Sequence, residues 1–488
     1  MVGRVFQRPD TRGQMPVPIK FGTDGWRAII ADDFTFDNVA LCAQGVAAYT
    51  KANPSPERGL LVGYDTRFAS PDFAARTAEV FAANGIPTLL CDKPTPTPVV
   101  TYNVLSRHTA GAAVITASHN PPQWNGFKFK PDYAGSASPE IIAQIEEQIA
   151  QAQQRPVSRL PLEQALSNGA VKMVDATLPY MKHLAKFVDL DSLKRSGLNI
   201  AVDAMHGAGA GYLPALLDGA RGVVTEIRGE YNPTFPGMQQ PEPIAHNLGP
   251  LSDLVVQSNA DVGIAYDGDA DRLGIIDERG RYLSTLQVFA LLALYLLEAR
   301  GERGPIVKSL TSSSMLFRLG QLFEVPVMET GVGFKFASPL MLKENALMAG
   351  EESGGYAFRG HIPERDGILS SLLLLDFMVR MDKRPSELLQ HLFDRVGEHH
   401  FGRRDIAFEA QARPKLEQSL SNGASASEIA GLKVTSVDTI EGVRFHFNQS
   451  WLAIRFSGTE PLVRIYAEAD HPDRVNALLD GAAALLGT

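Results

Sequence analysis

Four short motifs carry residue types that can do chemistry, and the first places Ser118 on a predicted turn. It reads Thr-Ala-Ser-His-Asn-Pro-Pro over residues 116–122 and follows a predicted strand at 112–115. Proline restricts the residue before it to an extended conformation, so we expect a rigid turn that projects the hydroxyl. Lys128 and Lys130 follow shortly after. An exposed serine beside cations could carry a phosphoryl group, but a strand that ends in a proline-stiffened turn would look the same.

The second motif is acidic and follows a predicted strand at 262–266; its charged residues are Asp267, Asp269, Asp271 and Arg272. Three carboxylates at alternate positions on a turn can converge on one hard cation. Without a cation, each like-charged pair at about 4 Å would cost about 4 kcal/mol at an effective dielectric near 20. An EF-hand is disfavoured because Arg272 stands where that loop needs glycine and the flanking elements are predicted strands. A solvated acidic turn is the other alternative.

The third motif, Ala-Gly-Glu-Glu-Ser-Gly-Gly over residues 349–355, suits hydrogen bonding to sugar hydroxyls. Its adjacent carboxylates, Glu351 and Glu352, are unfavourably placed to act as a glycosidase pair, because such groups must face each other across a bond. A plain loop remains an alternative for this segment.

The fourth motif is a small-residue turn between two arginines, Arg455 and Arg464. Ser457, Gly458 and Thr459 supply two hydroxyls and backbone amides, which together with forked guanidinium donors make a phosphate cradle. The Gly-Lys-Ser/Thr ending of a P-loop is missing. A surface hairpin with incidental arginines is the alternative.

Composition excludes several other classes of function. The 488-residue chain has a net charge of −9 with its basic residues spread throughout, so we expect no nucleic-acid partner. The longest apolar runs, such as 288–297, are too short to span a bilayer, and we expect no secretory signal and no membrane partner. Two cysteines, Cys42 and Cys91, make no disulfide framework, which favours a cytoplasmic location.

The elements that must position these motifs alternate between short apolar strands and amphipathic helices, which predicts α/β units. The first unit has strands at 60–64, 88–90 and 112–115 and helices at 72–83, 98–105 and 139–153, the last capped by Ser138. The second has strands at 198–202, 223–224 and 262–266 and a helix at 251–258. The third has helices at 286–299 and 367–381 and strands at 306–307, 325–327 and 346–348.

The end of the chain differs, because predicted strands at 405–408, 443–447, 452–456 and 462–467 enclose few helices, as in an α+β domain. The predicted domains are 1–168 with the serine turn, 169–282 with the acidic motif, 283–399 with the sugar motif and 400–488 with the phosphate cradle.

Taken in order, the four motifs resemble those of the α-D-phosphohexomutases, the phosphoglucomutase/phosphomannomutase superfamily. The opening Phe-Gly-Thr-Asp-Gly-Trp-Arg at 21–27 resembles that family's N-terminal motif, and the match extends over essentially the whole chain. The resemblance implies an α/β fold of four domains around a central cleft, three related α/β domains with mixed sheets and a C-terminal α+β domain. The division predicted from the alternation of elements agrees.

The resemblance also implies roles for individual residues. Ser118 would carry a phosphoryl group and, with the three aspartates, would bind one Mg²⁺ per subunit. Arg272 and Lys128 would neutralise the phosphoryl oxygens, with His119 beside them. The sugar hydroxyls would be held by Glu351 and Ser353. A third-domain loop that helps choose the sugar's orientation is matched by Gly331, Gly333 and Lys335. The non-reacting phosphate would be bound by Arg455, Ser457, Gly458, Thr459 and Arg464.

The implied reaction passes through glucose 1,6-bisphosphate, which serves as intermediate and activator. Phosphoserine 118 would donate its phosphoryl group to a hexose monophosphate and recover the other phosphate of the bisphosphate. We expect Lys128 to act as general base, assisted by Arg27, which requires that the pKa of Lys128 be lowered. The fourth domain is expected to be a hinged lid that excludes water.

Two positions depart from part of the family and bear on substrate choice. Bispecific enzymes and phosphoglucosamine mutases often have histidine where this chain has Gly355, and their third-domain loop can have one in place of Val332. The version seen here is more like phosphoglucomutases, so we expect glucose 1-phosphate as substrate. Phosphomannomutase or bispecific activity is the main alternative; phosphoglucosamine mutase, a metal-dependent phosphatase and a non-catalytic sugar-phosphate-binding protein are weaker ones. The expected partner is a hexose phosphate, and the chain could be a monomer or a homodimer.

Overall fold

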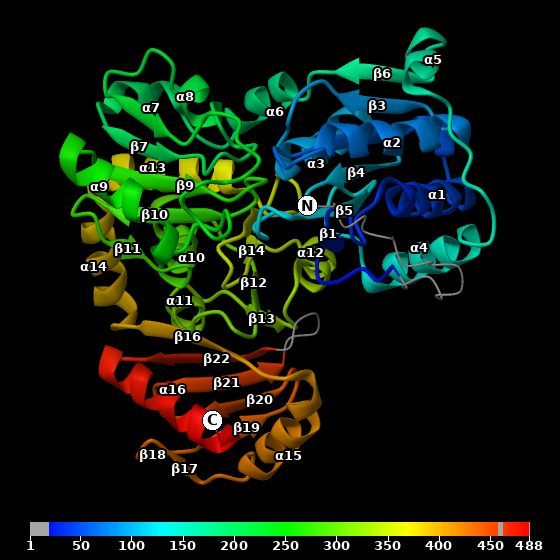
Figure 1. Ribbon diagram of the computed structural model, residues 1–488. Helices are drawn as coiled ribbons and strands as arrows, with labels where there is room; N and C mark the ends of the chain where they lie inside the picture. The colour runs from blue at the N-terminus through cyan, green and yellow to red at the C-terminus, as the bar shows by residue number, and fades with distance from the viewer. Residues whose placement is uncertain (1–18, 457–461, 488) are drawn as a thin grey trace, which may run out of the picture.

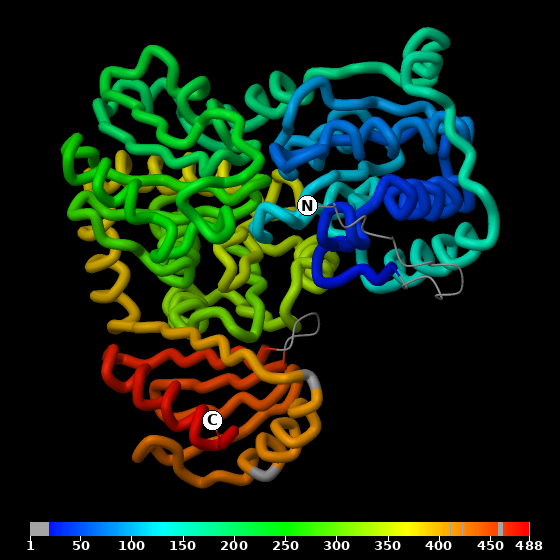
Figure 2. Tube along the Cα trace, in the orientation of Figure 1, coloured from blue at the N-terminus to red at the C-terminus, as the bar shows by residue number. Residues whose placement is uncertain are grey.

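The computed structural model describes residues 19–456 and 462–487, which form four main sheets with their helices (Figure 1). We call the parts of the chain that carry these sheets domains I to IV, in chain order. Most buried apolar side chains of domains I to III belong to one continuous cluster, whereas domain IV has a cluster of its own. The trace in Figure 2 shows domain IV set apart below the other three.

Domain I is built on a mixed six-stranded sheet with the order β1-β5-β4-β2-β3-β6. Strands β4, β2, β3 and β6 are parallel, and β5 and β1 complete one edge in antiparallel fashion. Ser138 caps helix α4 as predicted, by accepting a hydrogen bond from the amide of Ile141. The strands are Trp26–Ile29 (β1), Leu60–Tyr64 (β2), Thr88–Cys91 (β3), Gly111–Ile115 (β4), Trp124–Pro131 (β5) and Val171–Val174 (β6); the helices are Phe36–Ala52 (α1), Ser70–Ala83 (α2), Thr97–Arg107 (α3), Pro139–Ala152 (α4) and Leu162–Ser167 (α5).

The first sheet extends past the domain boundary predicted at residue 168. Strand β6 lies after that residue and pairs in parallel with β3, so the chain leaves domain I only after it. This strand has four residues, of which only Val171 is buried. An edge strand so short and so exposed has almost no apolar pattern by which to recognise it.

Domains II and III are also built on mixed sheets. The order is β11-β10-β9-β7-β8 in domain II and β13-β12-β14-β15 in domain III. In each sheet the parallel strands are joined by an antiparallel strand at one side, β10 in domain II and β15 in domain III. Domain II contains Thr177–Leu184 (α6), Leu190–Ser196 (α7), Ile200–Asp203 (β7), Tyr212–Leu216 (α8), Val224–Ile227 (β8), Gly249–Ser258 (α9), Val262–Tyr266 (β9), Leu273–Asp277 (β10) and Tyr282–Leu283 (β11). Domain III contains Thr285–Leu294 (α10), Ile306–Ser309 (β12), Met315–Leu322 (α11), Val327–Thr330 (β13), Phe334–Lys343 (α12), Met348–Gly350 (β14), Tyr356–Phe358 (β15), Gly367–Met381 (α13) and Pro385–Val396 (α14).

Two elements of domain III differ from the prediction. The strand predicted at 325–327 is β13, which begins at Val327, because Pro326 has no amide hydrogen to donate to a neighbouring strand. The helix predicted at 286–299 ends its α-helical part at Leu294 and continues as a π-helical turn over Tyr295–Ala299 (η3).

Domain IV has the antiparallel sheet that its sequence predicts. Its five strands have the order β16-β22-β21-β20-β19, and helix α16 packs against β16 and β22. The elements are His400–Ala407 (β16), Arg413–Gly423 (α15), Glu428–Ile429 (β17), Leu432–Lys433 (β18), Ser436–Asp438 (β19), Val443–His446 (β20), Trp451–Phe456 (β21), Leu462–Ala469 (β22) and Pro472–Leu486 (α16). No α-helix in the described parts of the chain combines the length and the apolar composition that a membrane-spanning helix requires.

Three of the four motifs lie at the ends of central strands. The serine turn follows β4, the acidic motif follows β9, and the sugar motif begins at the end of β14. The fourth motif connects the antiparallel neighbours β21 and β22. The three sheets of domains I to III therefore deliver their polar loops from strand ends, as is common in α/β proteins.

Candidate active site

Ser118 and the acidic motif, 149 residues apart in the sequence, lie in direct contact. The Ser118 hydroxyl donates a hydrogen bond of 2.8 Å to Oδ2 of Asp267. A side chain at Gly268 would place its Cβ 2.4 Å from the carbonyl oxygen of Ser118, so the two loops pack backbone against backbone. Only 1% of Ser118 is exposed, so the expectation of an exposed serine is wrong. The sequence could not reveal that a loop from another domain covers it.

The backbone of Ser118 is in the left-handed region, with φ of +52°. Residues other than glycine occupy that region at a cost, and they stay there only where the surroundings enforce it. The Ser118 amide donates to Oγ1 of Thr116, and Nδ1 of His119 lies 3.3 Å from the Ser118 hydroxyl. The conformation thus fixes the direction in which the hydroxyl points.

Arg67 supplies much of that enforcement, and the sequence interpretation did not single it out. Its buried guanidinium donates to four main-chain carbonyls of the serine turn and the residues after it, including Ser118 and Asn120 at 2.6 Å each. Asp65 pairs with this guanidinium at 3.2 Å and accepts a hydrogen bond from Ser70. Asp65 and Arg67 follow β2, the parallel neighbour of β4, and this shared sheet edge was the signal available.

The three aspartates of the acidic motif are fully buried, and one oxygen of each lies within 4.8 Å of the others. Oδ2 of Asp269 accepts hydrogen bonds from Lys128 at 2.8 Å and Thr97 at 2.6 Å. In the described part of the chain, neither Oδ1 of Asp269 nor Oδ1 of Asp271 accepts a hydrogen bond. Buried carboxylate oxygens without donors are suitable ligands for a hard divalent cation, so the residues present fit Mg²⁺.

The pKa directions of these aspartates reflect crowding of like charges. Burial, together with Asp271 and Asp269, raises the pKa of Asp267 well above its ordinary value. Burial also raises the pKa of Asp271, against the opposing effect of Arg365. Burial alone would raise the pKa of Asp269 as well, but the ammonium of Lys128 outweighs it and the pKa is lowered. The protein's own cations therefore neutralise the negative charge of these three carboxylates unequally, and a bound divalent cation would neutralise the remainder.

Cations from domains I and III surround the acidic motif. Lys128, on β5, pairs with Asp24 and Asp269 at 2.8 Å each. Arg365, from domain III, pairs with Asp271 at 2.9 Å and with Asp24 at 2.5 Å. Asp24 belongs to the N-terminal motif, and its carboxylate links these cations to one another. The sequence interpretation assigned no role to Asp24 or Arg365.

Gly355 makes room for Arg365. A Cβ at Gly355 would lie 2.3 Å from Cδ of Arg365, closer than two such atoms approach. The position where some family members have histidine is therefore filled here by the stem of an arginine that reaches the acidic motif.

The expectation that Lys128 acts as general base is not supported. Burial alone would lower the pKa of the Lys128 ammonium, but Asp24 and Asp269 outweigh it, and the pKa is raised. A lysine paired with two carboxylates keeps its proton and therefore presents a fixed positive charge. In contrast, burial and the cations Arg272 and Arg27 hold the pKa of His119 well below its usual range, so its imidazole is neutral.

The other two predicted cations flank the site. Arg27 donates from Nη1 to the side-chain oxygen of Asn120 at 2.6 Å. Arg272 donates to Glu242 at 2.9 Å, and its Nε lies 4.0 Å from Oδ2 of Asp267. Both predicted arginines thus lie next to the serine turn or the acidic motif.

The sugar motif and the third-domain loop are hydrogen-bonded to each other. Oε1 of Glu351 accepts a 2.8 Å hydrogen bond from the amide of Gly333, and burial raises the pKa of Glu351 to about 7. The hydroxyl oxygen of Ser353 is buried and has no hydrogen-bond partner among the described residues. Lys335 lies 3.4 Å from the carbonyl of Gly22 and so connects this loop to the N-terminal motif.

The predicted phosphate cradle is described only in part. Arg455 on β21 and Arg464 on β22 are cross-strand partners, so both guanidinium groups start from neighbouring positions of the sheet. Nε of Arg455 lies 3.5 Å from Glu441, and Nε of Arg464 lies 3.7 Å from Asp405. Ser457, Gly458 and Thr459 lie outside the described residues.

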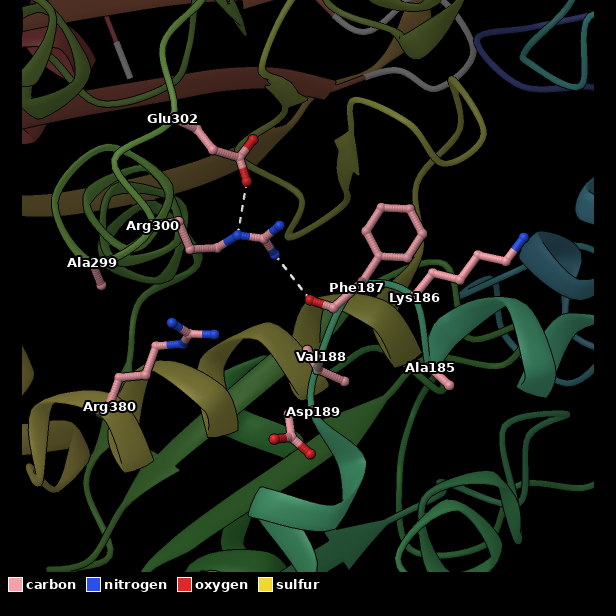
Figure 3. A pocket seen from close by; sticks show the side chains of 9 residues that line it. All are labelled: Ala185, Lys186, Phe187, Val188, Asp189, Ala299, Arg300, Glu302 and Arg380. Atoms are coloured by element: carbon pink, nitrogen blue, oxygen red, sulfur yellow. Dashed lines mark hydrogen bonds and ion pairs between the residues drawn. The ribbon is translucent and has the colours of Figure 1, made fainter.

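A hollow of about 500 Å³ opens elsewhere, where domain II meets η3 and α13 (Figure 3). Arg300 in this hollow pairs with Glu302 at 2.7 Å and donates to the carbonyl of Phe187. None of the predicted site residues that the structure describes lines it, so we do not assign the chemistry to this hollow. The lining residues are Ala185, Lys186, Phe187, Val188, Asp189, Ala299, Arg300, Glu302 and Arg380.

Comparison with known proteins matches the chain to one family along most of its length. Four models of the phosphoglucomutase/phosphomannomutase family match in order: α/β/α domain I over residues 18–156, α/β/α domain II over 178–280, α/β/α domain III over 286–396 and the C-terminal domain over 413–485. A phosphoglucomutase/phosphomannomutase of Thermococcus kodakarensis is 28% identical, covering 96% of this chain and 98% of its own. A phosphoglucomutase of Komagataeibacter xylinus is also 28% identical, covering 92% and 87%.

A solved structure that is more similar in sequence than these two relatives has the same fold. It is a protein of Thermus thermophilus described provisionally as a phosphomannomutase, with a TM-score of 0.85 and 34% identity over 97% of this chain and all of that one. Together with the four family models, this similarity confirms the fold class, three α/β domains with mixed sheets and a C-terminal α+β domain. The chain therefore belongs to the phosphoglucomutase/phosphomannomutase family, the α-D-phosphohexomutases, whose members are isomerases.

Proposed function

We propose that this protein is a phosphoglucomutase that interconverts glucose 1-phosphate and glucose 6-phosphate through phosphorylated Ser118. The observation that carries the proposal is the contact between the Ser118 hydroxyl and Asp267 in a buried group of carboxylates and cations. A serine in that position is next to ligands for a divalent cation and next to fixed positive charges. Phosphoryl transfer depends on these two kinds of electrostatic stabilisation.

In the proposed first half-reaction, the bond between Oγ of Ser118 and phosphorus breaks, and a new bond forms from phosphorus to the free sugar hydroxyl. Mg²⁺ bound by Asp267, Asp269 and Asp271 would supply Lewis-acid stabilisation of the phosphoryl charge. The second half-reaction reverses these bonds at the other phosphate of glucose 1,6-bisphosphate. Lys128 contributes a fixed charge on the phosphoryl oxygens, a role that its raised pKa supports.

His119 is our proposed group for moving the proton. Its imidazole is neutral because burial and neighbouring cations lower its pKa, and Nδ1 lies 3.3 Å from the Ser118 hydroxyl. In the first half-reaction the proton that the sugar hydroxyl loses ends on Oγ of Ser118, and in the second a proton returns to the sugar oxygen that the phosphate leaves. A neutral imidazole beside Oγ can accept this proton when the Ser118 hydroxyl attacks the second phosphate. Arg27 and Arg272 would contribute charge rather than proton transfer.

Substrate binding is proposed to involve the sugar motif and domain IV. The Ser353 hydroxyl, which has no hydrogen-bond partner among the described residues, and the carboxyl of Glu351 are available to sugar hydroxyls. Gly331, Gly333 and Lys335 belong to the adjoining loop. Arg455 and Arg464, with Ser457, Gly458 and Thr459, would hold the phosphate that is not reacting.

Relatives at 26–30% identity have different names, among them phosphoglucomutase and phosphoglucosamine mutase, so their names do not decide the sugar. The arginine that fills the space beside Gly355 favours glucose phosphates in our interpretation, since the histidine of bispecific relatives is absent. The test compares kcat/KM for glucose 1-phosphate, mannose 1-phosphate and glucosamine 1-phosphate, with Mg²⁺ and the matching bisphosphate present. We expect the highest value for glucose 1-phosphate; a higher value for mannose 1-phosphate would make the protein a phosphomannomutase.

Release of inorganic phosphate is measured in the same reactions. A metal-dependent phosphatase would release phosphate at the rate at which substrate disappears, and it would not need Ser118. We expect isomerisation without net phosphate release, and loss of isomerisation in Ser118→Ala. Full isomerisation by Ser118→Ala would contradict the proposed mechanism.

A further inference from the structure

Glu441 bridges domains III and IV through the two oxygens of one carboxylate. It lies between β19 and β20 in domain IV. Its Oε1 accepts a 3.2 Å hydrogen bond from the amide of Val332, in the third-domain loop. Its Oε2 faces Nε of Arg455 at 3.5 Å, an ion-pair distance but not a well-formed hydrogen bond.

The carboxylate fits closely against bare backbone on the domain III side. A Cβ added to Gly331 would lie 2.8 Å from Oε1 of Glu441, so a side chain there would push the carboxylate away. The next amide in the loop, that of Gly333, donates to Glu351 of the sugar motif. A continuous series of contacts therefore runs from Arg455 through Glu441 and the loop at 331–333 to Glu351.

The two cradle arginines differ in how firmly their carboxylates are held elsewhere. Asp405, beside Arg464, is held by two hydrogen bonds from Arg403 at 2.8 and 2.6 Å. Glu441 has no second cation: among the described residues, its only ion pair is with Arg455. Its Oε2 is also buried without a hydrogen-bond partner in the described structure. An incoming anion can therefore displace Glu441 from Arg455 without breaking another ion pair, whereas Asp405 is also held by Arg403.

We propose that Glu441 is an internal anion that a substrate's phosphate displaces from Arg455, and that this displacement releases Val332 and the third-domain loop. The inference rests on the proposed role of Arg455 in binding phosphate. A phosphate dianion has more charge and more acceptor oxygens than a carboxylate and can accept two parallel hydrogen bonds from a guanidinium. The exchange therefore couples phosphate capture in domain IV to the loop that contacts the sugar motif in domain III.

The first test measures binding of inorganic phosphate by calorimetry at constant ionic strength. Glu441→Gln keeps an oxygen that can accept from Val332 but removes the charge that competes for Arg455. We expect phosphate to bind about two to five times more tightly, the range that corresponds to loss of one partly exposed ion pair. Glu428→Gln, an exposed change of the same charge in domain IV, should bind as the unaltered protein does. Equal or weaker phosphate binding by Glu441→Gln would overturn the inference.

Arg455→Met separates failure of this inference from failure of the proposed function. If Arg455→Met leaves phosphate binding unchanged, Arg455 does not bind phosphate and both ideas fail. If Arg455→Met weakens binding but Glu441→Gln does not strengthen it, only the role of Glu441 is wrong. The inference further requires that Glu441→Gln have no effect in the Arg455→Met background.

A second measurement follows the loop itself by hydrogen exchange in a peptide that covers residues 331–333. Adding inorganic phosphate to the unaltered protein should speed exchange at the Val332 amide, because its acceptor leaves. Glu441→Ala should show the faster exchange without phosphate, whereas Glu441→Gln should keep slow exchange. Exchange that does not respond to phosphate would contradict the coupling between the two domains.

Discussion

Domains I to III and domain IV differ in what holds them in place. The serine turn, the acidic motif and the sugar motif belong to domains that share one continuous hydrophobic cluster. Domain IV has its own cluster and contacts domain III through polar groups, notably Arg444, which donates to Glu329 and to the carbonyl of Leu310 at 2.8–2.9 Å. The reacting groups thus lie in domains that share a core, whereas the phosphate cradle is on a unit with a core of its own that ion pairs help to join to domain III.

This difference suits the proposed reaction, in which the bisphosphate must turn over between two transfers. A rigid site keeps Ser118 and the neighbouring cations in the same relative positions for phosphoryl transfer in either direction. A unit attached by ion pairs can release and recapture a phosphate, since such pairs exchange with competing anions more easily than an apolar core separates. Substitutions in each of the two parts separate these two kinds of support.

Arg67→Met tests the rigid part. Removal of the guanidinium leaves Asp65 as an uncompensated buried charge and four carbonyls without a donor, so we expect a loss of about 3–5 kcal/mol in the free energy of unfolding. Isomerisation should also fall, because the strained backbone of Ser118 loses its support. Urea unfolding and turnover measure both effects. Arg76→Met, which removes a partly exposed pair with Glu79 at 3.3 Å, should cost less than about 1 kcal/mol. Equal losses in the two variants would contradict this account.

Glu351→Gln tests the sugar motif through pH. Because burial raises the pKa of Glu351 from 4.5 to about 7, the folded state binds a proton between these values that the unfolded state does not. Stability from this group is therefore present at low pH and lost as pH rises from about 4.5 to 7, by about 3 kcal/mol at most. Glu351→Gln should remove that loss, so the variant becomes the more stable protein above pH 7. Parallel stability curves for the two proteins between pH 5 and 8 would refute the explanation.

Gly355→Ala tests the packing between the sugar motif and the acidic motif. The added Cβ would lie 2.3 Å from Cδ of Arg365, so that side chain must move away from Asp24 and Asp271. We expect a cost of about 1–3 kcal/mol in unfolding free energy, together with weaker Mg²⁺ binding. Gly249→Ala is the matched control, because a Cβ there meets nothing within 4 Å. A change as small as that of the control would show that Arg365 is not constrained by Gly355.

Arg444→Met tests the attachment of domain IV and should have the smallest effect on overall stability. Arg444 is mostly buried but Glu329 is partly exposed, so we expect a loss of about 1–2 kcal/mol in the docking of domain IV. Thermal unfolding should then show domain IV melting separately, with the transition of domains I to III unchanged. Arg474→Met, which changes an exposed position of domain IV, should give the same thermal unfolding profile as the unaltered protein. Destabilisation of domains I to III by Arg444→Met would show that the two parts are not independent.

The sequence predicts local structure well where the signal is local. Helix α13 at 367–381, strand β9 at 262–266 and the Ser138 cap appear as predicted, because their periodicity and capping depend on neighbours in the chain. The edge strand β6 was not predicted, because it is short and exposed, and the start of β13 was predicted too early, because it depends on a single proline.

The site is predictable as a set of motifs but not as a set of contacts. The motifs locate Ser118 and the acidic residues, whereas the burial of Ser118 depends on a loop from a different domain. Arg67 and Arg365 act through partners far away in the sequence, and no spacing between neighbouring residues predicts those contacts. The raised pKa of Lys128 likewise depends on two distant carboxylates, and it is opposite in direction to the lowered pKa that the expected role as a base requires.

The central claim is that Ser118 carries the phosphoryl group, and intact mass spectrometry tests it most directly. Protein incubated with Mg²⁺ and glucose 1,6-bisphosphate should gain the mass of one phosphoryl group, and Ser118→Ala should gain none. A catalytically active protein that gains no phosphoryl group, or a Ser118→Ala variant that gains as much as the unaltered chain, would contradict the account.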